Sequence, residues 1–239
     1  FYLSGIDQEE SVLLLFKNEN NSETKEILFL IKPNSALTHW EGEKISEKKA
    51  FTISGIKTVH WLEHLEDITE KLISSVENIY TNNNEHYRAK VVTETREARF
   101  NKWIQEKYSK KKIERSNPIL QQLRAVKDSI EIELIKKACD ITEKGFRRVL
   151  SFVKPGVWEY EIEAEFSHEF LKNRSRKFAY SPIIASGTNS NILHYVENNN
   201  QCKDGDVILL DVGAEYANYS SDMTRTIPVS GHFSKRQKE

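Results

Sequence analysis

Methionine, cysteine and long apolar runs are scarce in this sequence. It has one methionine and two cysteines in 239 residues, and two cysteines cannot form the disulfide framework of a small secreted domain. No apolar run reaches the roughly 18 residues that a transmembrane helix requires. No signal peptide is visible, although the chain begins at Phe1. These absences favour a cytoplasmic protein that does not cross a membrane.

An excess of charge of either sign is also missing. The chain carries 35 basic and 36 acidic residues, for a formal net charge of -1 at pH 7. This balance supports no electrostatic attraction to nucleic acid or to an anionic membrane. One basic run, Lys110–Lys112, is interpreted as the solvated end of a helix. Hydrophobic residues make up 38% and charged residues 30%, which is typical of a globular protein of one or two domains.

The first half of the chain alternates between strand-like and helix-like segments. Apolar runs at 11–16 and 26–31 predict two strands joined by a hairpin-like loop, and 77–80 predicts a weaker strand. Apolar residues at helical spacing predict helices over 61–73 and around 100–108. Four histidines, none with a complete metal-ligand set, lie in this half: His39, His60, His64 and His86. His60 and His64 have i,i+4 spacing, but a packing or surface role is favoured.

The second half begins after a polar stretch that ends in Pro118, and we place a domain boundary between residues 116 and 117. Asp128 and Glu131 have the spacing of a capping box at the start of a long helix. Pro155-Gly156 ends that helix, and a second amphipathic helix follows over about 158–170. The segment 179–187 then predicts a strand.

Two acidic residues, Asp211 and Asp222, border the most informative stretch. Val207–Leu210 is an apolar run after the turn residues Asp204-Gly205, and a second strand-like run covers 223–229. A hairpin centred between Tyr216 and Ala217 would place Asp211 directly opposite Asp222 on one sheet surface. Two facing carboxylates repel, so a compensating group is required.

Two kinds of compensation are open. Arg225 could pair with one acid and form a buried salt bridge. Alternatively, the carboxylate oxygens could hold divalent metal ions that activate water for attack. The spacing of the two acids does not decide between these interpretations.

Several segments together resemble one family. They are Ile184–Tyr195 (IASGTNSNILHY), Asp204–Asp206, Asp211–Tyr216 (DVGAEY) and Tyr219–Gly231 (YSSDMTRTIPVSG) with Phe233. This pattern closely resembles the Xaa-Pro aminopeptidases (aminopeptidase P) of the pita-bread metallopeptidases. A looser likeness, in Trp40–Lys44 and Gly55–Val59, is to the N-terminal domain of the same group.

The resemblance implies a fold and a reaction. The expected fold is an α/β N-terminal domain of the creatinase/prolidase type over 1–116, followed over 117–239 by the first half of an α+β pita-bread catalytic domain. The implied reaction is metal-dependent release of the N-terminal residue from peptides with proline in second position. The implied cofactors are two divalent metal ions, with Mn²⁺ the usual one. A homo-oligomer is expected for the full-length protein.

The resemblance also implies roles for four residues. Asp211 is expected to chelate one metal ion and Asp222 to bridge two. Thr224 is expected to orient a ligating carboxylate by a hydrogen bond. His194 is expected to act as the catalytic residue that hydrogen-bonds the substrate or the tetrahedral intermediate. Tyr180 is a further candidate for the wall of the substrate pocket.

One departure from the family pattern concerns the remaining ligands. The family uses five, and the last three, one His and two Glu, have no counterpart here; His232 and Glu239 do not match them. We therefore expect a fragment truncated at both ends that is inactive alone and binds metal weakly. Two alternatives stay open for the parent protein: an Xaa-Pro dipeptidase (prolidase) and a catalytically dead pita-bread module used for binding.

Overall fold

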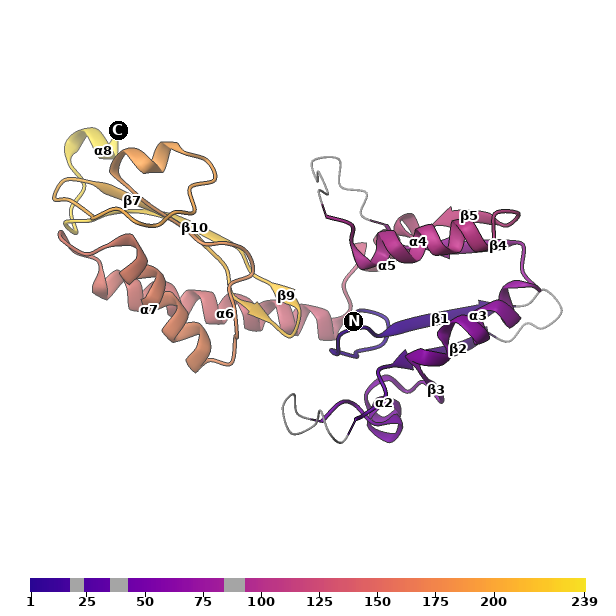
Figure 1. Ribbon diagram of the computed structural model, residues 1–239. Helices are drawn as coiled ribbons and strands as arrows, with labels where there is room; N and C mark the ends of the chain where they lie inside the picture. The colour runs from indigo at the N-terminus through magenta and orange to yellow at the C-terminus, as the bar shows by residue number, and fades with distance from the viewer. Residues whose placement is uncertain (18–23, 35–42, 84–92) are drawn as a thin grey trace. The chain divides into compact units, whose positions relative to one another are not determined.

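The computed structural model describes residues 1–17, 24–34, 43–83 and 93–239. The chain divides into two compact units, residues 1–123 and 124–239, which are shown in Figure 1 and described one at a time below. Pro118, which marked the predicted boundary at 116/117, is the second residue of helix α5 (Asn117–Ala125). The domain boundary itself stays a prediction.

The first unit is an alternating α/β unit, as predicted. Its elements before α5 are β1 (Val12–Lys17), β2 (Thr24–Leu30), α2 (Glu47–Ser54), β3 (Thr58–Trp61), η1 (Leu62–His64), α3 (Leu65–Ile73), β4 (Asn78–Thr81), α4 (Arg96–Lys107) and β5 (Lys112–Arg115). Strands β1 and β2 pair antiparallel, and β3 joins β2 in parallel. Strands β4 and β5 form a separate parallel pair. The three strand predictions in this half are thus confirmed.

The core of the first unit lies under β2. Its last four residues are buried, and two of them, Leu28 and Leu30, belong to an apolar cluster with residues of β3 and α2. Helix α2 begins at Ser46, whose hydroxyl accepts a hydrogen bond from the backbone N–H of Lys49, and this bond satisfies one of the free donors of a first helical turn. Ala50 on α2 packs against Leu28 and Leu30. The N-terminal strands are therefore held by ordinary apolar packing.

Two predicted helix boundaries in this unit are wrong. Trp61 belongs to β3, and the helix proper begins only at Leu65, because β-sheet pairing of His60 and Trp61 with β2 overrides the helical spacing. The run Lys110–Lys112 is not a helix end. Helix α4 stops at Lys107, Lys111 donates to the backbone carbonyls of Ser74 and Val76, and Lys112 opens β5.

The second unit packs two long helices against an antiparallel sheet. Its elements are α6 (Ser129–Phe152), α7 (Glu159–Lys172), β6 (Ile183–Ser186), η2 (Gly187–Asn191), β7 (Val207–Val212), β8 (Glu215–Tyr216), β9 (Tyr219–Ser220), β10 (Met223–Pro228) and α8 (Lys235–Lys238). The sheet order is β10-β7-β6, and β8 and β9 form a short hairpin. Figure 1 shows α6 and α7 along one face of β7 and β10.

The apolar core of this unit lies between the helices and the sheet. Phe146 on α6 and Phe166 on α7 meet edge to face, with 5.2 Å between ring centroids, and Ile208 and Leu210 of β7 belong to the same buried cluster. Helix α6 starts with the predicted capping box. The Asp128 side chain accepts from the Glu131 N–H, and Glu131 accepts from the Asp128 N–H. Because the helices cover one face of the sheet, the opposite face is the one available for a functional site.

No helix within the described parts of the chain combines the length and the apolar character needed to cross a membrane.

The two cysteines differ in a way that alkylation can measure. Cys139 is exposed on α6, whereas Cys202 is 1% exposed and burial raises the pKa of its thiol to about 11. Because the thiolate is the reactive form, we expect iodoacetamide at pH 8 to modify Cys139 faster than Cys202 by roughly 100-fold or more. Peptide mass spectrometry over time provides the measurement. The Cys139→Ser variant isolates Cys202, and rapid native labelling of that variant would contradict the buried position.

Candidate metal centre

Asp211 lies within β7, on the face of the strand that points away from the helices. The strand alternates strictly, with Ile208, Leu210 and Val212 buried against the core and the residues between them partly exposed. This alternation follows from the two-residue period of a strand. Asp211 therefore lies at the edge of the core, in the last but one position of β7, close to the strand end at which the sequence placed it.

The predicted pairing of the two acids is wrong, because the observed register is shifted by two residues. In the sheet, Asp211 stands opposite Thr224, not Asp222, and Met223 stands opposite Val212. The hairpin turns between Ala217 and Asn218, and both residues have positive φ, 50° and 67°. Such a pair makes the two-residue turn that suits strand twist. The turn is displaced by one residue from the predicted centre, so Asp222 becomes the diagonal neighbour of Asp211.

The two carboxylates nevertheless meet, because one tyrosine joins them. The hydroxyl of Tyr180 lies 2.6 Å from Asp211 Oδ1 and 3.1 Å from Asp222 Oδ1, so its single proton is shared between two acceptors. Burial, then the hydrogen bond to Asp211, raises the pKa of Tyr180 above its ordinary value. Sequence reasoning offered Tyr180 only as a pocket residue and missed this bridging position.

Asp222 is held in place from the side of helix α6. Its neighbour Ser221 is buried, and the Ser221 hydroxyl lies 2.7 Å from the hydroxyl of Thr142 on α6. The N–H of Ala214 donates to both hydroxyls, and Ser221 Oγ donates to the carbonyl of Ala214. Every polar group in this cluster has a partner. The hairpin that ends at Asp222 is therefore tied to the helix layer by satisfied buried hydrogen bonds.

Arg225 does not form the salt bridge that the sequence left open as one of two alternatives. Its guanidinium is exposed and donates to the carbonyl of Thr224, and it forms no ion pair with either acid in the described part of the chain. The Thr224 side chain is exposed as well and makes no hydrogen bond to Asp222 there. The register explains the difference, since Thr224 lies across from Asp211. The interpretation of the acid pair as part of a buried salt bridge with Arg225 is thus wrong.

His194 lies on the turn that follows η2, with its side chain exposed. Within the described ranges it makes no hydrogen bond or ion pair, and nothing joins it directly to Asp211 or Asp222. The next residue, Tyr195, is buried, so His194 is a surface residue on an anchored loop. The structure therefore leaves its predicted role as a prediction.

The two histidines of the first unit that the structure describes, His60 and His64, form no metal site. His60 lies on β3 with its ring 6.0 Å from that of Phe29, and His64 lies in η1 beside Glu63. The two are not on one helix, so the i,i+4 interpretation is removed. His39, His86 and most of the Trp40–Lys44 segment lie outside the described residues.

The donor set of Asp211 and Asp222 fits part of a divalent metal site. Both groups offer hard carboxylate oxygens, the ligands preferred by Mg²⁺, Ca²⁺ and Mn²⁺. In the parts of the chain that the structure describes, no cluster of three or more His, Cys, Asp or Glu side chains is placed to hold a metal ion. The two acids can thus supply two ligands, and further ligands are required from elsewhere.

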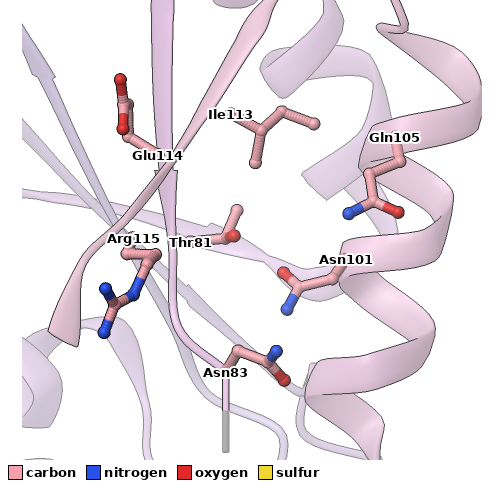
Figure 2. A pocket seen from close by; sticks show the side chains of 7 residues that line it. All are labelled: Thr81, Asn83, Asn101, Gln105, Ile113, Glu114 and Arg115. Atoms are coloured by element: carbon pink, nitrogen blue, oxygen red, sulfur yellow. The ribbon is translucent and has the colours of Figure 1, made fainter. Parts of the chain in front are cut away.

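A separate hollow of about 480 Å³ lies in the first unit, between α4 and the β4-β5 pair (Figure 2). Asn101 and Gln105 point into it from α4. The buried Oδ1 of Asn101 has no partner within the described residues, although its Nδ2 donates to the carbonyl of Asn82. Glu114 and Arg115 complete the lining with Thr81, Asn83 and Ile113. One carboxylate among amides is not a metal centre.

Two family models match the chain. Residues 133–239 match metallopeptidase family M24, and residues 1–80 match the aminopeptidase P N-terminal domain. Together they cover more than half of the chain. Both matches agree with the two-part organisation expected from the sequence.

Curated relatives and solved structures point the same way. The Xaa-Pro aminopeptidase of Haemophilus influenzae is 30% identical over the whole chain, which covers 53% of that protein. Proline aminopeptidase P II from Yersinia pestis is 28% identical with a TM-score of 0.85, over 99% of this chain and 54% of that one. Zinc-substituted Escherichia coli aminopeptidase P in complex with product has a TM-score of 0.84 at 28% identity, over 99% and 54%. The chain spans about half the length of these relatives.

Proposed function

We propose that the whole protein is a metal-dependent Xaa-Pro aminopeptidase, because residues 133–239 match metallopeptidase family M24 and residues 1–80 match the aminopeptidase P N-terminal domain. It releases the N-terminal residue from peptides whose second residue is proline. The observation that carries the proposal is the meeting of Asp211 and Asp222 at the Tyr180 hydroxyl, inside the segment that matches the metallopeptidase model.

Each site residue has a role in this proposal. Asp211 and Asp222 would hold two divalent ions, Mn²⁺ in our proposal, and further ligands would be required because no third ligating side chain joins them among the described residues. Such ions supply Lewis acidity and a nucleophile at neutral pH. Tyr180 keeps the two carboxylates together before metal binds. Its hydroxyl reduces the repulsion between them.

His194 is the proposed hydrogen-bond donor to the substrate. Its loop follows β6, the neighbour of the strand that carries Asp211, and its imidazole is exposed rather than paired within the described residues. An unpaired imidazole can donate to a carbonyl oxygen or move a proton near neutral pH. Thr224 lies opposite Asp211 in the sheet, and it is the residue that we propose to orient the Asp211 carboxylate.

The proposal extends to the setting of the enzyme. We propose homo-oligomeric assembly of the whole protein and a cytoplasmic location, in which the unpaired Cys139 and Cys202 remain reduced. Peptides with proline in second position are the substrates.

Metal removal and peptide length test the function. The whole protein loaded with Mn²⁺ is expected to release the first residue of an Xaa-Pro-Xaa tripeptide, to lose this activity in EDTA, and to regain it when Mn²⁺ is restored. Chromatography of the released amino acid provides the measurement, with Xaa-Ala-Xaa as the control peptide. Cleavage of Xaa-Pro dipeptides but not tripeptides would establish a dipeptidase instead. Metal binding without hydrolysis of any peptide would establish a binding module.

A further inference from the structure

Glu159, the first residue of α7, places a carboxylate in the interior of the second unit. It is 0% exposed, and it has no ion-pair partner within the described residues. Four donors surround it instead. Oε1 accepts from the N–H and the hydroxyl of Ser186, and Oε2 accepts from the hydroxyl of Tyr195 and the N–H of Asn200, at distances of 2.7 to 2.9 Å. A buried carboxylate is costly unless every lone-pair direction is used, and here each oxygen has two donors.

The four donors all belong to one loop. Ser186 ends β6, Tyr195 lies in the middle of the loop, and Asn200 lies where the chain returns toward α7. Glu159 therefore binds the loop at its start, its middle and its end. Its backbone adds a further bond, since the Glu159 N–H donates to the carbonyl of Asn200.

The same loop is joined to the sheet that carries the acids. Asn198, which is 2% exposed, accepts from the N–H of Ile184 and donates to the carbonyl of Pro182. Residues Ile183 to Ser186 pair with Asp211 to Ile208 of β7. The start of the loop is thus held by the pairing of β6 with the strand that carries Asp211, and Glu159 holds the rest of the loop.

His194 immediately precedes the anchored Tyr195. Its side chain is exposed and makes no hydrogen bond or ion pair of its own in the described residues, so its position depends on the loop backbone and on the buried ring that follows. Burial, followed by the hydrogen bond to Glu159, raises the pKa of Tyr195 to about 12. The Tyr195 hydroxyl therefore stays protonated and able to donate throughout the neutral range.

We propose that Glu159 is a positioning residue for catalysis, because its carboxylate sets the loop that places His194 against the substrate. This inference rests on the proposed function, in which His194 contacts the substrate. Glu159 itself is fully buried, so it would act through the loop and not by direct contact with substrate or metal. Loss of the carboxylate should therefore lower turnover while the metal site of Asp211 and Asp222 remains intact.

The Glu159→Gln variant of the whole protein separates these effects. In this variant the amide NH₂, which cannot accept a hydrogen bond, replaces one carboxylate oxygen and faces its two donors. Two of the four hydrogen bonds are therefore lost with little change in side-chain volume. We expect kcat on Xaa-Pro-Xaa to fall by roughly 100-fold, with Mn²⁺ affinity by calorimetry unchanged. Glu169→Gln is the matched control, since Glu169 is also a buried acid of α7 but its carboxylate accepts from Asn173 and lies near Arg148. It should leave kcat unchanged.

A double-mutant cycle identifies the route of the effect. If Glu159 acts through His194, Glu159→Gln should lower kcat much less in a His194→Ala background than in the wild type. Full additivity would overturn the proposal, as would an unchanged kcat in Glu159→Gln. Should Glu159→Gln fail to fold, Tyr195→Phe removes one of the same bonds, and kcat should fall by roughly tenfold without loss of metal affinity.

Two further results separate this inference from the proposed function. A wild-type protein that is inactive with Mn²⁺ would overturn the proposed function. Hydrogen exchange of residues 186–200 that is unaltered in Glu159→Gln would independently overturn the anchoring of the loop.

Discussion

Replacing Asp211 by alanine is expected to lower kcat/KM of the whole protein on Xaa-Pro-Xaa peptides by roughly 10³-fold or more. The substitution removes one of the two carboxylates that meet at Tyr180, and with it a ligand of the proposed metal site. Charge that develops on the substrate oxygen then loses its strongest stabilisation. Steady-state kinetics at saturating Mn²⁺ provide the measurement.

The stability of the variant distinguishes a metal ligand from a structural acid. Removal of one carboxylate also removes its repulsion of the other. The free energy of unfolding of the metal-free variant should therefore lie within about 1 kcal/mol of the wild-type value. Mn²⁺ should raise the Tm of the wild type and leave that of the variant nearly unchanged, because ligand binding stabilises only the state that binds.

Asp204→Ala is the matched control for Asp211→Ala. Asp204 is an exposed aspartate in the turn before β7, and no hydrogen bond or ion pair is formed by its side chain in the described residues. It should alter neither kcat/KM nor the Mn²⁺ shift in Tm. Activity retained by Asp211→Ala would show that other groups hold the metal ions.

Local patterns predicted the sheet strands of the second unit and the start of its first helix. Alternation and the apolar run of 207–210 located β7, and the Asp128–Glu131 spacing located the cap of α6. These features depend on neighbours within a few residues, where the periodicity of side chains determines which face is buried. The resemblance of the 184–233 segments to one family agrees with the match of residues 133–239 to family M24.

The hairpin register could not be obtained in the same way. Ala217 has a φ of 50°, a conformation that favours Gly or Asn, and nothing in the side chain of alanine signals it. Only Asn218 carried a turn signal. An error of one residue in the turn moved the partner of Asp211 from Asp222 to Thr224.

Polar contacts between residues far apart in the sequence also could not be predicted. Tyr180 reaches acids 31 and 42 residues away, and no local pattern encodes such a contact. Glu159 has the sequence signature of an ordinary exposed acid in the first turn of a helix, yet it is buried because Ser186, Tyr195 and Asn200 surround it. Residues that organise a site through distant donors thus become visible only in the fold.

Substitution of Gly213 by alanine is expected to disrupt the whole acid-bearing hairpin. A Cβ at this position would lie 1.9 Å from the backbone oxygen of Ser221 and 3.1 Å from the Tyr180 ring. Backbone atoms cannot rotate away as a flexible side chain can, so the hairpin must shift. The shift breaks the Ser221–Thr142 contact and leaves the buried Ala214 N–H without its acceptors. Overpacking together with lost buried hydrogen bonds should cost about 3 kcal/mol or more.

Urea unfolding of the Gly213→Ala chain, followed by circular dichroism, measures this cost, and Gly205→Ala is the comparison. Gly205 has a φ of +82° but no atom within 4 Å of an added Cβ, so its substitution carries only left-handed backbone strain of about 1 kcal/mol. Gly213 has no such strain, and its cost comes from the close approach of two chain segments alone. If Gly213→Ala is as stable as Gly205→Ala, the close approach of Gly213 to the backbone of Ser221 is wrong.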